Sequence, residues 1–275
     1  MSADILVTGG EGQLALEFKK LLPEAHFAGR AELDITDLQA VQSFVKQHQI
    51  KTIINCAAYT AVDNAEDDAA RAYLVNAAGP ENLSKTGCRL IHFSTDYVFD
   101  GKKGTPYLPE DECRPLSVYG RSKRAGELAA LSAPCAAVIR TSWLYAAQGK
   151  NFVKTIYRLG HERDCLKVVA DQAGSPTYAC DLAAAVVTLL PKLTPENSGI
   201  YHYADAGVCS WYEFAVEIMK LCGLSTRVEP ITTAEYPLKA VRPAYSVFDC
   251  SRIKDTFGVE IPCWKKSLET CLKQF

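Results

Sequence analysis

The sequence predicts an α/β fold in which a doubly wound parallel sheet is followed by a smaller C-terminal lobe. Two observations predict this class. Through the first half of the chain, short apolar runs alternate with helical patterns, which is typical of a parallel sheet with helices on both faces. Beyond residue 150 the alternation loosens. With 275 residues, 48% of them hydrophobic, the chain can form a large domain with a sizeable core.

The first half is predicted to alternate strands and helices in order. The strands are apolar runs whose length is typical of buried strands, at residues 4–8, 26–29, 52–58, 89–95 and 136–145. Helical patterns separate them, at 12–22, 37–48, 67–86 and 117–132. The segment GKKGTPYLP is rich in glycine and proline breakers, so residues 99–116 are predicted to form a loop.

The second half is less regular. Helices are predicted at 151–161, 180–190, 210–222 and 263–273, and strands at 166–170 and 199–204. We therefore predict one domain over residues 1–150. Residues 151–275 are predicted to form mainly a smaller lobe, with one or two elements within about 163–204 returning to the sheet.

Composition excludes several classes of protein. The net charge is −2, with 30 basic and 32 acidic residues spread along the chain, so no nucleic-acid surface or polybasic membrane anchor is predicted. The longest apolar runs are too short to span a bilayer. The N-terminus enters a strand without a basic region or cleavage site, so we expect an intracellular, cytoplasmic protein. The 11 cysteines are scattered and form no Cys-x-x-Cys pair, which indicates reduced thiols rather than a zinc site.

The stretch GGEGQLALE, residues 9–17, follows the first predicted strand. Glycines at positions 9 and 12 allow the backbone to approach a pyrophosphate, and the start of the following helix supplies free N–H groups. The small Ala15 suits the close packing of helix on strand. This spacing departs from the strict G-x-G-x-x-G pattern, but its position in a βαβ unit predicts dinucleotide binding by residues 1–150.

The choice of dinucleotide is predicted from the end of the second strand. Arg30 could accommodate the 2′-phosphate of NADPH, whereas Asp34 could bind the ribose hydroxyls of NADH. Arg30 favours NADPH, with NADH as the alternative. An ordinary surface arginine is also compatible with the sequence.

The stretch SVYGRSK places Tyr119 four residues before Lys123, so both side chains lie on one face of the predicted helix. A lysine ammonium beside a phenol would lower the phenol pKa and make it a usable proton donor. A chain with 13 tyrosines can contain such a pair by chance. The pair gains weight from STDYVFDG, which places Thr95 at the carboxyl end of a strand, where ligands bind in open α/β sheets.

In several blocks taken together the chain resembles the extended short-chain dehydrogenase/reductase family, a Rossmann-type fold, and within it the dTDP-4-dehydrorhamnose reductases. The blocks are GQLALE, AAYTAVDNAE, STDYVFDG, VYGRSK, RTSWLY, DQAGSPTYACDLA, GIYHYADAG, SWYEFA and RPAYS. They cover nearly the whole chain in order. The resemblance implies reduction of the 4-keto group of a dTDP-sugar to a hydroxyl, with NADPH or NADH as hydride donor.

The resemblance also implies roles for individual residues. Tyr119 would be the general acid, Lys123 would hold the nicotinamide ribose and lower the tyrosine pKa, and Thr95 would bind the sugar oxygen. The implied cofactor site comprises Gly9, Gly12, Gln13, Leu14, Arg30, Asp34, Ile35, Ala57, Ala58, Tyr59 and Phe93 besides Tyr119 and Lys123. The implied substrate site comprises Thr95, Asp96, Tyr97, Trp143, Asn151, Gln172 and Arg242.

Other interpretations stay open at this point. Sugar-nucleotide 4,6-dehydratases need a glutamate two residues after the strand-end threonine, where this chain has Tyr97. Epimerases of the family keep the Tyr-Lys pair, and a regulatory subunit of the methionine adenosyltransferase type could keep it without catalysis. Trp143 could be a core residue, Asp63 a residue at a helix start, and His92 a packed neutral histidine.

A metal site is not predicted. Some reductases of the family form a magnesium-dependent dimer through glutamates, and Glu17 matches one of those positions. Gln274 stands where another would be sought. We therefore expect a monomer, or a homodimer independent of magnesium.

Overall fold

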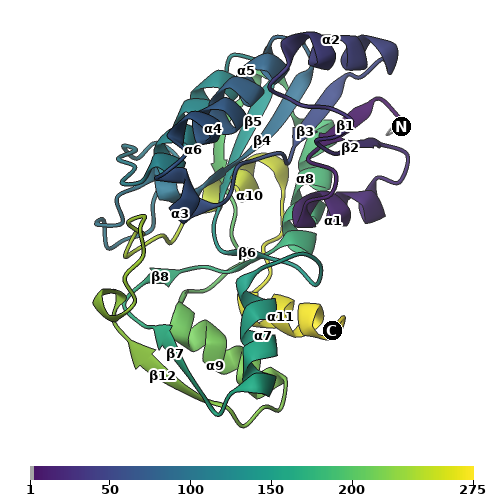
Figure 1. Cartoon of the computed structure of the whole chain (residues 1–275). Helices are drawn as coiled ribbons and strands as arrows, with labels where there is room; N and C mark the ends of the chain where they lie inside the picture. Colours follow the sequence, from purple (N-terminus) through teal and green to yellow (C-terminus); the bar gives the residue numbers. More distant parts are fainter. Residues whose placement is uncertain (1–2) are drawn as a thin grey trace.

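The computed structural model describes residues 3–275 and contains a parallel six-stranded sheet (Figure 1). Its strands are β1 (Ile5–Thr8), β2 (His26–Ala28), β3 (Thr52–Asn55), β4 (Arg89–Thr95), β5 (Ala136–Thr141) and β10 (Gly199–His202). They lie in the order β10-β5-β4-β3-β1-β2, and every neighbouring pair is parallel. From β1 the chain goes first to β2 on one side and then to β3 on the other side, so the strand order reverses at β1. Open α/β sheets bind ligands beside such a reversal. The predicted α/β class is confirmed.

Helices cover both faces of the sheet (Figure 1). One face packs against α1 (Gln13–Leu21), α8 (Ala179–Leu189) and α10 (Ser251–Phe257). The other packs against α2 (Leu38–Gln47), α5 (Gly79–Ser84) and α6 (Val118–Ala130). Successive strand residues point to opposite faces, so Ile54 joins the first of these cores and Ile53 the second. The strands are therefore buried on both faces and mainly apolar, with buried polar residues such as Ser94, Arg140 and His202 among them.

The smaller lobe lies beyond the carboxyl ends of the strands, in the lower part of Figure 1. Its elements are α7 (Phe152–Glu162), β7 (Cys165–Val169), α9 (Trp211–Leu221), β12 (Arg227–Ile231) and α11 (Trp264–Leu272). The strands β7 and β12 pair with each other in parallel, and the three helices enclose a separate core around Phe214 and Leu268. Of the strands that follow residue 150, only β10 among the described residues joins the main sheet.

Short elements connect the two parts. The pair β6 (Leu144–Tyr145) and β9 (Thr177–Tyr178) is parallel, and the pair β8 (Ala173–Gly174) and β11 (Cys209–Ser210) is antiparallel. Within residues 3–275, no helix combines the length and the apolar composition needed to cross a membrane.

Three predicted elements differ in the structure. The helix predicted over 67–86 is divided into α4 (Ala69–Tyr73), a π-helical turn (Leu74–Ala78) and α5. Pro80 has no N–H to bond the carbonyl four residues earlier, so the helix widens before it. The strand predicted over 52–58 ends at Asn55, and that predicted over 136–145 is interrupted at Trp143, whose φ of 49° is left-handed. The elements β12 and α10 were not predicted.

Candidate active site

Two adjoining cavities lie at the carboxyl ends of β1, β3, β4 and β5. The larger measures about 620 Å³ and the smaller about 410 Å³, and both are lined by Glu11, Gly12, Cys56 and Ala58. The larger contains the predicted catalytic residues Tyr119, Lys123 and Thr95. The smaller reaches Arg30 and Asp34. The sheet thus brings the predicted cofactor and catalytic residues into one continuous cleft.

The glycine turn after β1 forms the junction of the cavities. Gly9 has a φ of 64°, and a Cβ atom there would lie 2.7 Å from the backbone nitrogen of Ala57. Only glycine permits this contact between the turns after β1 and β3. Gly12 precedes the first turn of α1, and no side chain caps it, so the N–H groups of that turn stay available. Gln13 and Leu14 line the larger cavity.

The smaller cavity brings both predicted cofactor-selecting residues together. Arg30 Nε lies 3.7 Å from Asp34 Oδ2 at the rim, and both side chains are exposed. Hydrogen bonds from the backbone and side chain of Thr36 hold the pKa of Asp34 below its usual value. Ile35, Ala57 and Tyr59 line the cavity as predicted, and so does Arg71, which was not predicted.

The helix α6 presents Tyr119 and Lys123 to the larger cavity. Its N-cap Ser117 accepts a hydrogen bond of 3.1 Å from the backbone of Gly120. Gly120 itself lies so close to the turn after β4 that a Cβ atom would be 2.2 Å from the carbonyl oxygen of Tyr97. The absence of a side chain therefore lets the start of α6 pack directly on the end of β4. Tyr119 is consequently buried with its phenol against the side chain of Thr95.

The electrostatics of this pair differ from the prediction. Burial raises the pKa of Tyr119 to about 12, although the hydrogen bond with Thr95 opposes the shift. Burial lowers the pKa of Lys123 to about 8, and its Nζ donates to the carbonyl oxygen of Phe93 at 2.6 Å. The expected lowering of the tyrosine pKa by the lysine is wrong for this geometry, because desolvation dominates and the ammonium group bonds Phe93.

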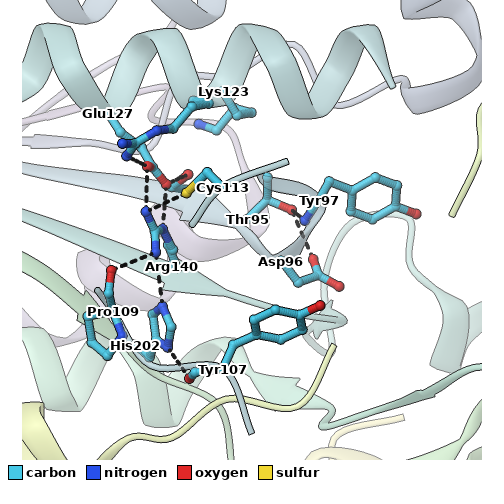
Figure 2. A network of polar contacts seen from close by, with 12 residues as sticks. Thr95, Asp96, Tyr97, Tyr107, Pro109, Cys113, Lys123, Glu127, Arg140 and His202 are labelled. Carbon is cyan, nitrogen blue, oxygen red and sulfur yellow. Dashed lines mark hydrogen bonds and ion pairs between the residues drawn. The ribbon is translucent and has the colours of Figure 1, made fainter. Parts of the chain in front are cut away.

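Asp96 and Tyr97, which Figure 2 shows beside Thr95, also line the larger cavity. The hydroxyl of Thr95 donates to Asp96 Oδ1 at 2.9 Å and accepts from the backbone of Tyr97 at 3.2 Å. Burial raises the pKa of Asp96 to about 6. The ring of Tyr97 meets that of Tyr119 edge to face, with centroids 5.4 Å apart.

Two stacked tryptophans form another part of the cavity wall. Trp143 and Trp211 stack with centroids 3.5 Å apart and an angle of 10° between the rings, and both line the larger cavity. Trp143 is therefore a cavity residue and not part of a closed core. Trp211 was not predicted, although it begins a helix in the SWYEFA block. Its Nε1 donates to Gln172 Oε1 at 3.2 Å.

Three predicted substrate residues do not line either cavity. Asn151 caps α7, accepting from the backbone of Lys154 at 3.0 Å, and donates to Gln13 Oε1 at 3.2 Å. Gln172 supports Trp211. Arg242 forms an ion pair with Asp63, with Nη2 and Oδ2 2.7 Å apart. We expected Asn151, Gln172 and Arg242 to face the cavity, but each contacts a neighbouring side chain instead.

Further cavity residues escaped the sequence analysis. Thr141 ends β5 as Thr95 ends β4, and Ser142 comes next, so the rule that ligands bind at strand ends could have found them. Glu11, Thr60 and Lys150 lie in loops without a comparable signal.

The sequence also left the interpretation of Asp63 and His92 open. Asp63 lies in the short helix α3 (Val62–Ala65), and His92 is buried with Nδ1 3.0 Å from Asn55 Nδ2, where burial holds its pKa well below the usual value.

Within residues 3–275, no group of three or more histidine, cysteine, aspartate or glutamate side chains is arranged to hold a metal ion. Glu17 is buried and its Oε2 lies 2.7 Å from Lys20 Nζ. Gln274 donates to the hydroxyl of Tyr178 at 2.7 Å.

Comparison with known proteins gives a consistent result. The family described as RmlD substrate binding domain matches residues 3–275. The dTDP-4-dehydrorhamnose reductase of Sinorhizobium fredii is 41% identical, over 96% of this chain and 94% of the relative. A probable dTDP-4,6-dihydroxy-2-methyloxan-3-one 4-ketoreductase of Streptomyces antibioticus is 40% identical, over 96% and 92%. The solved dTDP-4-dehydrorhamnose reductase of Bacillus anthracis in complex with NADP is 38% identical and covers 100% of both chains, with a TM-score of 0.94.

Proposed function

The chain belongs to the dTDP-4-dehydrorhamnose reductase family, and from this we propose that it is an NADPH-dependent enzyme that reduces dTDP-4-dehydro-β-L-rhamnose to dTDP-L-rhamnose. One observation favours this reaction above others. The phenol of Tyr119 and the hydroxyl of Thr95 meet in the wall of the larger cavity, one helical turn from Lys123. Two hydroxyl donors at one point suit a carbonyl oxygen that becomes negative during reduction.

The turn after β1 fits a dinucleotide. Its backbone approaches β3 so closely that a side chain at Gly9 would collide, and the first turn of α1 opens toward the cleft without a cap. A nicotinamide cofactor bound there supplies a hydride. Arg30 would contact the 2′-phosphate, Ala57, Ala58 and Tyr59 the adenosine side, and Lys123 the nicotinamide ribose. NADH remains the alternative, since Asp34 lies beside Arg30.

Tyr119 acts as the general acid. Because burial raises its pKa to about 12, the phenol is protonated at neutral pH and can donate to the ketone oxygen as that oxygen gains charge. Thr95 donates a second hydrogen bond to the same oxygen. Its hydroxyl bonds Asp96 in the structure, so it must rotate to face the substrate.

The sugar lies between two walls of the larger cavity. Asp96 and Tyr97 form one wall, and Trp143 stacked on Trp211 forms the other. Residues 151–275 thus serve mainly as the substrate-binding lobe, with residues 1–150 as the dinucleotide-binding domain. Asn151, Gln172 and Arg242 take part by holding Gln13, Trp211 and Asp63 in place.

A second candidate is the reduction of another dTDP-4-keto-6-deoxysugar. It is favoured by the 40% identity to a relative named as a probable 4-ketoreductase of a different dTDP-linked sugar. Both substrates share the dTDP group and the 4-keto group. They differ in the sugar that the tryptophan wall must accept.

We place the reaction in the cytoplasm. All eleven cysteines are free thiols, which suits a reducing compartment where nicotinamide cofactors are available. The enzyme acts as a monomer, or as a homodimer that does not require magnesium.

The test measures NADPH oxidation by the purified protein with three compounds in parallel. The first is dTDP-4-dehydrorhamnose, the second is dTDP-4,6-dihydroxy-2-methyloxan-3-one, and the third is dTDP-glucose. The proposal expects turnover of the first, and none of dTDP-glucose, which has no keto group. Higher kcat/KM with the second would establish the alternative. NADPH binding without oxidation of either would indicate a regulatory protein and refute the proposal.

A further inference from the structure

A buried ion pair lies behind the catalytic residues and outside both cavities. Glu127 is on α6 and Arg140 on β5, and their side chains are 0% and 1% exposed. Arg140 Nε and Nη2 donate to the two carboxylate oxygens at 2.8 and 2.9 Å (Figure 2). Replacing a buried pair by apolar residues is often neutral or stabilising, so stability alone does not explain such a pair. The segments that this ion pair connects indicate its role more directly.

The ion pair completes a regular contact between α6 and β4. Tyr119, Lys123 and Glu127 follow one another at intervals of four residues, so they lie along one face of the helix. They meet three successive residues of β4: Tyr119 lies against Thr95, Lys123 donates to the carbonyl of Phe93 at 2.6 Å, and Ser94 donates to Glu127 Oε1 at 2.6 Å. A shift of the helix along the strand would break all three contacts.

Arg140 fixes the other side of this contact. On the sheet it is the partner of Ser94 on β4 and of His202 on β10. Its Nη1 donates to the carbonyl of Pro109 at 3.2 Å and to His202 Nε2 at 3.3 Å, and Nδ1 of His202 in turn donates to the carbonyl of Tyr107 at 3.0 Å (Figure 2). The segment of residues 107–113 leads to the start of α6. The network therefore holds both the helix and the loop before it.

We propose that Glu127 and Arg140 are positioning residues for the reduction, which set the placement of Tyr119 and Lys123 against Thr95. The inference rests on the proposed function. Neither residue touches the cavity, so neither is catalytic. Because proton transfer is sensitive to small displacements of the donor, loosening this contact slows the chemical step and leaves the pyrophosphate turn intact.

The test compares three variants with the wild type. Glu127→Gln with Arg140→Met removes both fully buried charges together. Arg124, which also donates to Glu127 Oε2 at 2.6 Å, keeps a hydrogen-bond acceptor in the amide oxygen that Glu127→Gln introduces, and its side chain is 30% exposed to solvent. Ser94→Ala removes the hydrogen bond to Glu127, and, because Ser94 also lines the larger cavity, the KM of this variant for the dTDP-sugar is measured alongside kcat. Glu162→Gln with Arg158→Met is the matched control, because this pair has the same residue types but is exposed on α7. Circular dichroism and thermal unfolding report folding, and fluorescence titration reports the Kd for NADPH.

The proposal expects the first two variants to lose about 10-fold or more in kcat, with a larger solvent deuterium isotope effect and a Kd for NADPH close to that of the wild type. The control keeps wild-type values. A folded double variant with wild-type kcat overturns the proposal. If the double variant does not fold, wild-type kcat in Ser94→Ala overturns it. If the wild-type protein binds NADPH but reduces no dTDP-keto sugar, the proposed function is wrong, and this inference, which rests on it, is wrong as well.

Discussion

The ammonium group of Lys123 donates a 2.6 Å hydrogen bond to the backbone carbonyl of Phe93, two residues before Thr95 on the same strand. This contact fixes the helix α6 against the end of β4. Burial raises the pKa of Tyr119 and lowers that of Lys123, so under the proposed mechanism Lys123 would act on Tyr119 through position. The first two predictions concern Tyr119 and Asp96, two buried groups at this end of β4.

Tyr119→Phe should lower kcat by about 10²-fold or more, because the substitution removes the proton donor and leaves the ring in place. The Kd for NADPH should change little, since the phenol hydroxyl is not required at the pyrophosphate. Stopped-flow and steady-state assays of NADPH oxidation measure the effect. Unchanged turnover would remove Tyr119 from the mechanism.

Asp96→Asn should stabilise the protein above about pH 6. Burial raises the pKa of Asp96 from 3.8 to about 6, so the folded state binds more protons than the unfolded state between these values. Wild-type stability therefore falls, relative to the variant, as pH rises through this window. The gain is at most about 3 kcal/mol at neutral pH and vanishes below pH 4. Urea unfolding of both proteins from pH 4 to 8 measures it, and a pH-independent difference would contradict the assignment.

Arg30→Ala should weaken NADPH binding about 10-fold while affecting NADH less, because a charged contact to the 2′-phosphate is lost. Asp34→Ala is the matched change on the other member of the ion pair. It should weaken NADH binding more than NADPH binding. Isothermal titration with both cofactors measures the four affinities. Equal losses for both cofactors in Arg30→Ala would count against a role at the 2′-phosphate.

Trp211→Leu should raise KM for the dTDP-sugar by up to about 10-fold, since stacked aromatic pairs contribute about 1 kcal/mol beyond burial. It also removes the partner of Trp143, so the fluorescence response to substrate should change. Trp264 lies in the core of the lobe and serves as an internal reference. Wild-type KM would show that Trp211 does not shape the sugar site.

Removal of divalent cations with EDTA should leave both activity and sedimentation behaviour unchanged. Glu17 is paired with Lys20 through Oε2 while its Oε1 is buried without a partner among residues 3–275, and Gln274 offers only a neutral amide, which bonds Tyr178. Assay and analytical ultracentrifugation, with and without added magnesium, provide the check. A magnesium-dependent dimer would contradict this expectation.

Much of the site could be predicted from local sequence. Strand ends and helix starts are encoded by short patterns, so Gly9, Thr95 and Tyr119 were found in regions that the structure brings into one cleft. Trp211 was missed because a helix start in the distant lobe gives no local sign that it faces the cleft. Arg242 was expected in the cleft, but the chain pairs it with Asp63, 179 residues away.

The sequence by itself determined the succession of most strands and helices along the chain, the glycine turn and the helix that carries Tyr119 and Lys123, because these depend on periodicity and on the conformational limits of a few residues. Only the tertiary structure decided how α6 sits on β4, which partner Lys123 meets, and that Glu127 and Arg140 form a buried pair. These depend on contacts between segments far apart in the chain, where burial and packing select one partner among many that a local pattern allows.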